Sequence, residues 1–302
     1  MSSPYSATAH QALLRTTLGA MMISFSAVFV KLAHVNPTVS GFYRVLFGGC
    51  FLLVILLVRK ELRWYGWRFL GLALVTGIFF ALDLYAWHRS IQYVGPGLAT
   101  ILGNFEVFMV PMVAFVIYGE KPAFRLVLSV PPAMAGLFMI VGTPWGQLPP
   151  DFQVGIYYGL ATAVFYTGFL MVFRKMQSHP ASPPAVYNLM VVSFATAVFL
   201  GLEMVRTGES FAIPDTQSLA ALGGLALMSQ TLGWLLIGHS LPRIPAAIAG
   251  LILLLQPSLS FLWDVLFFNR ETSPMAWTGV ALALCAIYIG ATSSKSGGPD
   301  KT

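Results

Sequence analysis

The stretch GPGLATILGNFEVFMVPMVAFVIYGEKP, from Gly95 to Pro122, decides the class of this protein. It opens with a proline beside small residues, continues through a long apolar run, and closes on a glutamate followed by a proline. A helix needs about 20 mainly apolar residues to cross the hydrocarbon core of a bilayer. This stretch is long enough, so it predicts one membrane-spanning helix.

Similar apolar runs fill most of the chain, which has 302 residues. Apolar residues make up 57% and charged residues only 9%, whereas a soluble domain carries roughly 25% charged residues. Lipid must therefore be the solvent for much of the surface. The runs predict an all-α membrane protein with ten transmembrane helices and no soluble domain between them. The ten predicted spans are 14–34, 38–58, 68–91, 96–118, 124–143, 153–173, 184–206, 218–241, 245–268 and 273–293.

The lysines and arginines predict how the chain is oriented. One side of the predicted membrane carries twelve of the seventeen: Arg15, Arg59, Lys60, Arg63, Arg68, Lys121, Arg125, Arg174, Lys175, Arg243, Lys295 and Lys301. The other side carries four: Lys31, Arg89, Arg206 and Arg270. Because positive loops are retained in the cytoplasm, both termini are predicted to be cytoplasmic. The scatter of these residues over short loops argues against nucleic acid as a partner.

A second stretch resembles the first and predicts an internal repeat. IPAAIAGLILLLQPSLSFLWDVLFFNRETSP, from Ile244 to Pro274, has the same order of proline, apolar run, glutamate and proline. A chance likeness between two membrane hairpins stays open. If the repeat is real, residues 1–150 and 151–302 each hold five helices, and the odd number makes the repeats inverted around a central cavity. Secondary transporters are built this way.

On this architecture and these paired motifs, the sequence resembles the drug/metabolite transporter superfamily, specifically its ten-helix EamA-type members. It is most similar to the YddG-type bacterial amino-acid exporters. That similarity rests on Gly103, Asn104, Phe105, Tyr166, Lys175 and Trp234. The resemblance implies a carrier of the bacterial inner membrane. The chain departs from the family pattern where Glu106 stands opposite Pro257 of the second repeat.

Three ionisable residues fall deep inside predicted spans, where each costs about 2.5–3.5 kcal/mol at the helix centre. Arg44 and Asp83 lie at similar depth on neighbouring spans. They form either a structural ion pair or a substrate or proton site, and the two alternatives are compatible. Glu106, near the midplane, either lines the cavity or makes a buried contact between helices.

Some other residues have predicted structural roles. Asp264, His88 and Arg89 lie near the outer interface, where snorkelling toward water suffices. Small residues spaced by four predict close helix contacts, and they are Gly155 with Gly159 and Ala246 with Gly250.

Aromatic and amide side chains complete the candidate substrate site. Asp83 and Trp87 are four residues apart, so they share one helix face. Gln230 and Trp234 have the same spacing. Most intramembrane aromatics only pack, but the resemblance favours cavity positions for Tyr166 and Trp234, with Phe105 as a further apolar wall. Gln256, beside Pro257, marks a point where a helix can kink.

The sequence predicts a transporter rather than an enzyme. It has no P-loop, no H-E-x-x-H motif and no potassium-channel filter, and it predicts neither a cofactor nor a metal site. We expect export of small amphipathic metabolites, chiefly amino acids including aromatic ones, through a cavity lined by spans 3, 4, 6, 8 and 9. Carriage of a drug or nucleotide sugar, a membrane enzyme, and a structural subunit are the alternatives. The sequence leaves a monomer and a homodimer both open.

Overall fold

The computed structural model describes residues 7–118, 124–141, 145–177, 182–240, 252–253 and 255–293. Every regular element in these ranges is a helix. The predicted all-helical class is confirmed for this part of the chain. Glu120 and Pro245, which belong to the two similar stretches, lie outside the described residues, as do Ala246 and Gly250.

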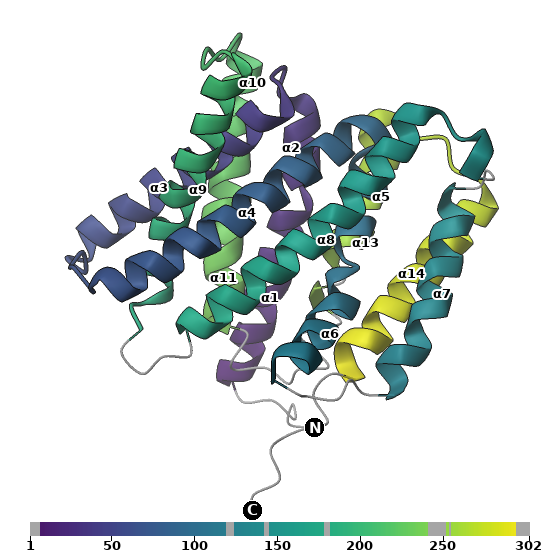
Figure 1. The fold of residues 1–302 in the computed structure, drawn as a ribbon, viewed down its shortest axis with the longest axis horizontal. Coiled ribbons are helices and arrows are strands. Elements are labelled where there is room, and N and C mark those ends of the chain that lie inside the picture. Colours follow the sequence, from purple (N-terminus) through teal and green to yellow (C-terminus); the bar gives the residue numbers. More distant parts are fainter. Residues whose placement is uncertain are drawn as a thin grey trace, which may run out of the picture.

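Some helices are long and uninterrupted, and others are short and follow one another closely along the chain (Figure 1). The first half of the chain contains α1 (Ala7–Ser24), α2 (Ser26–Leu32), α3 (Pro37–Val58), α4 (Trp67–Val94), α5 (Pro96–Gly103), α6 (Glu106–Tyr118) and α7 (Phe124–Val141). A short 3₁₀ turn, η1 (Trp145–Gln147), precedes the second half. That half contains α8 (Pro150–Gln177), α9 (Ala185–Thr207), α10 (Thr216–Gly224), the π-helix η2 (Leu225–Gly233), α11 (Trp234–Ser240), α13 (Leu255–Phe268) and α14 (Pro274–Ser293).

Six helical stretches of the described chain are long and apolar enough to cross a membrane. They are Gln11–Leu32, Pro37–Val58, Trp67–Val94, Pro150–Phe173, Ala185–Thr207 and Thr216–Ile237. Shorter apolar helices cover Pro96–Val110, Val127–Ile140 and Pro274–Ile289. The protein is therefore a multi-span membrane protein, and each of the ten predicted ranges contains described helix.

Two helix breaks interrupt the first half, and side chains stabilise both. Between α5 and α6, Asn104 donates from its Nδ2 to the carbonyl of Thr100 at 2.8 Å. Between α1 and α2, Ser24 and Ser26 donate their hydroxyls to the carbonyls of Met21 and Ile23, each at 2.6 Å. Broken backbone inside a membrane is tolerated where such groups satisfy it or where it borders a polar cavity.

Glycine permits the closest helix contacts. On α8, a Cβ at Gly155 or Gly159 would lie 2.5 Å from atoms of Tyr93 or Leu102, which confirms the predicted close approach there. On α7 and α14, Gly136 and Gly279 face each other so closely that a Cβ on either would lie 2.6 Å from the backbone of the opposite helix. The α7–α14 pair lies at one edge of the helix bundle (Figure 1).

Candidate functional site: a central cavity

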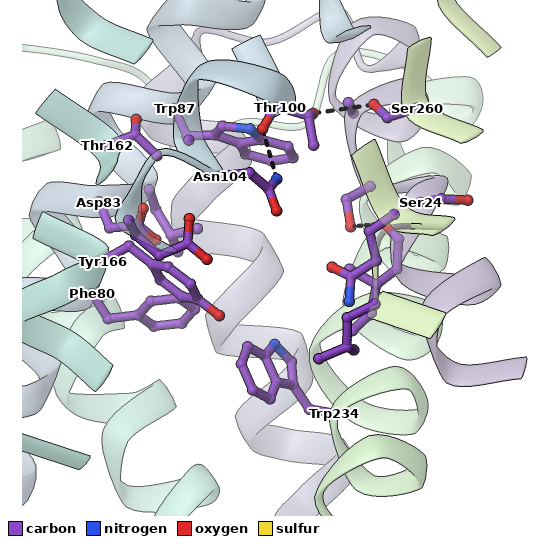
Figure 2. Close-up of a pocket in the computed structure, with 18 of the residues that line it drawn as sticks. Ser24, Phe80, Asp83, Trp87, Thr100, Asn104, Thr162, Tyr166, Trp234 and Ser260 are labelled. Atoms are coloured by element: carbon purple, nitrogen blue, oxygen red, sulfur yellow. Dashed lines mark hydrogen bonds between the residues drawn. The ribbon is translucent and has the colours of Figure 1, made fainter. Parts of the chain in front are cut away.

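A cavity of about 330 Å³ lies between the two halves of the chain. Its described lining comes from α1, α2, α3, α4, α5, α6, α8, α11 and α13. Figure 2 shows Phe80, Asp83 and Tyr166 on one side, with Ser24 and Ser260 across from them. The predicted lining by spans 3, 4, 6, 8 and 9 omitted the helices of spans 1 and 2, which also contribute.

The helix α4 forms one wall through a single face. Phe80, Asp83, Leu84 and Trp87 all line the cavity. Their spacing of three and four residues places them on one side of the helix. A carboxylate and an indole therefore face the same space, as the sequence spacing predicts.

Arg44 of α3 lies close to this wall. Its guanidinium carbon is 5.6 Å from the ring centroid of Trp87, and its Nε donates to Oε1 of Gln230 at 3.2 Å. Arg44 and Asp83 are each 6% exposed. Among the described residues, no ion pair joins them. The cavity therefore contains a guanidinium and a carboxyl group that do not bind each other directly.

Glu106 is the first residue of α6, immediately after the helix break. It lines the cavity, and its Oε2 is buried without a hydrogen-bond partner in the described part of the chain. A helix N-terminus favours a carboxylate because its free N–H groups carry partial positive charge. The break thus gives Glu106 a favourable backbone position while leaving one oxygen unpaired.

One buried ring supports three aromatic side chains of the cavity wall. Phe169 of α8 is 1% exposed and does not line the cavity. Phe80 and Tyr166 stack on it at centroid distances of 4.7 and 5.6 Å, and Trp234 packs edge-on at 6.2 Å. Close packing around Phe169 therefore sets how far these rings extend into the cavity.

The ten candidate residues divide into two groups by position. Seven line the cavity: Arg44, Asp83, Trp87, Glu106, Tyr166, Trp234 and Gln256. Phe105 is 5% exposed and packs against Phe108 at 5.6 Å. Gln230 and Pro257 are also buried and absent from the lining.

Sequence reasoning missed most of the small polar groups in the cavity. Ser24 accepts a hydrogen bond from Trp263 Nε1 at 3.0 Å, and Thr100 and Ser260 share one at 3.1 Å between α5 and α13. Serine and threonine are frequent at helix contacts in membranes. A serine or threonine that lines a cavity therefore has no distinguishing feature in the sequence. These residues are identified only by the packing of their helices around the cavity.

Two residues predicted to snorkel at the outer interface are instead buried in the protein. Asp264 is 3% exposed, binds Arg270 Nη1 at 3.0 Å and accepts from the Gly97 amide at 3.1 Å. His88 is fully buried and contacts the carbonyl of Leu84 through Nδ1 at 2.6 Å. The prediction was wrong for both, because neighbouring helices cover this depth. In the described chain, no cluster of three His, Cys, Asp or Glu residues could hold a metal ion.

Three comparisons bear on this architecture. Residues 11–142 and 153–291 each match the EamA-like transporter family. A relative in Bacillus subtilis (strain 168), "Uncharacterized transporter YwfM", is 20% identical over 258 residues, which cover 84% of each chain.

A solved crystal structure has a similar fold, with a TM-score of 0.65 and 18% identity over 95% of this chain and 98% of that one. At that identity it is evidence of the fold alone. The two family matches together cover most of the sequence, and they agree with the helical membrane architecture. This chain is thus a transporter rather than an enzyme, and it belongs to the EamA-like transporter family.

Proposed function

We propose that the protein is a ten-span secondary transporter built from two inverted five-helix repeats, residues 1–150 and 151–302. The two family matches, 11–142 and 153–291, support this division. Helix packing supports it too, because three pairs of counterparts are in contact: α3 with α9, α5 with α13 and α7 with α14. Such pairing is expected when a two-fold axis in the membrane plane relates the repeats.

Both termini are proposed to be cytoplasmic, in the inner membrane of a bacterium. The start of α1 and the end of α14 lie at the same end of the bundle (Figure 1). At the opposite end, Arg206 binds Glu203 and Arg270 binds Asp264. The assignment itself rests on the lysines and arginines, four on this side against twelve on the other. A fluorescent-protein fusion at the C-terminus tests it, since such a fusion fluoresces only when it stays in the cytoplasm.

The proposed substrates are small amphipathic metabolites, chiefly amino acids including aromatic ones, and the proposed direction is export. One observation carries this proposal: a single cavity contains the basic Arg44, the acidic Asp83 and Glu106, and aromatic walls. A zwitterion with an apolar side chain requires these features. Small-molecule sites span about 300–1,000 Å³, so a cavity of about 330 Å³ suits a small metabolite.

A nucleotide sugar or other phosphorylated substrate is a weaker candidate. Binding a diphosphate generally requires several convergent arginines or lysines. Arg44 is the one basic side chain among the described lining residues. The likeness to YddG-type amino-acid exporters, through residues such as Tyr166 and Trp234, favours the amino-acid proposal.

Transport is proposed to proceed by alternating access. Residues from both halves of the chain line the cavity, so rocking one half against the other would expose the site to each side in turn. The breaks beside Phe25 and Asn104 lie next to the cavity. They supply positions where short half-helices can move without bending a long helix.

The experiment is transport of a labelled amino-acid panel into proteoliposomes. We expect faster movement of aromatic and aliphatic amino acids than in empty vesicles. Replacing Tyr166 or Trp234 by alanine is expected to slow that flux. The matched control is Trp67→Ala, because Trp67 is 78% exposed at the start of α4. If no amino acid moves faster than in empty vesicles, the proposal fails.

A further inference from the structure

Gln230 makes its side-chain hydrogen bonds to Arg44 and Ser193 and does not line the cavity. Its Oε1 accepts from Arg44 Nε at 3.2 Å, and its Nε2 donates to Ser193 Oγ at 3.0 Å. Gln230 is 1% exposed and Ser193 is fully buried. Both ends of the amide are therefore occupied, and its orientation is fixed by a hydroxyl on α9. This residue, expected to bind substrate, instead contacts Arg44, which lines the cavity.

The local backbone is shaped to place this amide. Gln230 lies in η2, a nine-residue π-helix, and π-helical turns are frequently found at functional sites. Thr231 donates its hydroxyl to the carbonyl of Ala226, five residues earlier, at 3.0 Å, which suits the wider turn. Opposite η2, Gly48 of α3 leaves the space that Gln230 fills, since a Cβ there would overlap Gln230 Cγ.

The bond to Gln230 determines which part of Arg44 remains available. A guanidinium presents five N–H donors in a planar fork. Gln230 occupies Nε, and neither Nη atom makes a hydrogen bond within the described residues. The two Nη groups form the end of the fork, which can bind both oxygens of one carboxylate. The adjacent indole of Trp87 contributes a cation–π contact that steadies the plane.

The charges around Arg44 complete the argument. A buried guanidinium without a direct carboxylate partner is unfavourable until an anion arrives. Asp83 and Glu106 line the same cavity, and their carboxyl oxygens can accept hydrogen bonds from an ammonium. The cavity therefore contains one group that can bind a carboxylate and two that can bind an amine.

We propose that Arg44 binds the substrate carboxylate through its two Nη groups, and that Gln230 is a positioning residue which holds the fork in that orientation. This inference rests on the proposed transport of amino acids. It adds the group that recognises the carboxylate, and it changes the expected role of Gln230. Without Gln230, Arg44 keeps its charge but loses its fixed orientation, so carboxylate recognition weakens while amine recognition persists.

The test compares phenylalanine with phenethylamine, which lacks the carboxylate, as inhibitors of labelled amino-acid uptake into proteoliposomes. In the wild type we expect phenylalanine to inhibit at a lower concentration than phenethylamine. In Gln230→Met, which keeps the side-chain length, we expect the phenylalanine inhibition constant to rise about 10–100-fold, as for loss of one charge-assisted hydrogen bond. The phenethylamine constant is expected to stay unchanged.

The matched control is Gln217→Met, since Gln217 is exposed and donates to the carbonyl of Leu32 rather than to Arg44. If Gln230→Met does not fold, as judged by gel filtration, Ser193→Ala provides the same test by freeing the amide. We expect Ser193→Ala to raise the phenylalanine inhibition constant and to leave the phenethylamine constant unchanged.

Each outcome of this test decides between the two proposals. If the wild type takes up no labelled amino acid, the proposed function fails, and this inference fails with it. If the wild type takes them up but does not prefer phenylalanine to phenethylamine, only the carboxylate subsite is refuted. An equal effect of the Gln230 variant on both inhibitors, or no effect on either, gives Gln230 a merely structural role and overturns the inference alone.

Discussion

Replacing Asp264 by alanine is expected to destabilise strongly the end of the bundle that lies opposite the start of α1. Its carboxylate binds Arg270 Nη1 at 3.0 Å and the Gly97 amide at 3.1 Å. Arg270 also donates to the carbonyl of Val94 at 2.8 Å. The cluster covers Gly95, whose φ of 83° favours glycine and where a Cβ would lie 2.8 Å from Asp264 Oδ2. The pair thus joins the start of α5 to the end of α13.

The magnitude follows from burial. The side chains of Asp264 and Arg270 are 4% and 18% exposed. Removing one partner of a buried pair costs about 3–5 kcal/mol, because the other charge stays uncompensated. An exposed pair is worth about 0.2–1 kcal/mol. The chain offers such a pair at the same end, where Arg206 binds Glu203 within α9 and is 72% exposed.

The assay is thermal unfolding in detergent, followed by tryptophan fluorescence. At roughly 2 °C per kcal/mol for a large domain, we expect Asp264→Ala to lower Tm by about 6–10 °C. The control Glu203→Ala is expected to lower it by about 2 °C or less. Asp264→Asn keeps an acceptor for the Gly97 amide, so its Tm shift is expected to lie between those of Asp264→Ala and Glu203→Ala. Equal small shifts for Asp264→Ala and Glu203→Ala would refute the reasoning that burial makes the first pair matter.

Three further predictions concern other parts of the fold. Gly136→Ala is expected to cost about 1–3 kcal/mol by forcing α7 from the backbone of α14, whereas Gly71→Ala, which faces open space, is expected to be neutral or stabilising in the same unfolding assay. The Ser218 amide and His34 lower the pKa of Asp215, so its carboxylate stabilises the folded state above about pH 4. This stabilisation is lost as the pH falls through the lowered pKa. We expect Tm to fall less with decreasing pH for Asp215→Asn than for the wild type, and an identical fall would contradict this. Phe169→Ala is expected to cost about 3–5 kcal/mol of stability and to weaken binding of aromatic substrates. Phe169→Leu is expected to have a smaller effect on both stability and binding. Unchanged binding by the folded alanine variant would show that this ring does not position the cavity wall.

Much of the fold could be predicted because lipid imposes a simple requirement on sequence. Each spanning segment must be apolar and helical to satisfy its own backbone, so helices fall within the predicted ranges. Helix breaks were harder to foresee. The break at Asn104 depends on a side-chain bond to Thr100, and the break at Phe25 has no proline to signal it.

The candidate site was predictable where one helix face carries it. Asp83 and Trp87 line the cavity together because a spacing of four residues defines a face. Contacts between helices were not predictable in that way. Gln230 and Trp234 have the same spacing, yet Trp234 lines the cavity and Gln230 does not. The wider π-helical turn ends at Gly233, between these residues, so spacing rules for an α-helix do not hold there.

The sequence by itself determined that this is a helical membrane protein and which residues bring charge into its spans. Those conclusions depend on local composition and on the cost of placing polar groups in lipid. Only the tertiary structure decided which charges meet. Asp264 is joined to Arg270 while Asp83 and Arg44 stay apart in the cavity, and Gln230 turns toward the arginine rather than the open space. Such choices depend on distances of a few ångströms between helices far apart in the chain, which no pattern along a single helix encodes.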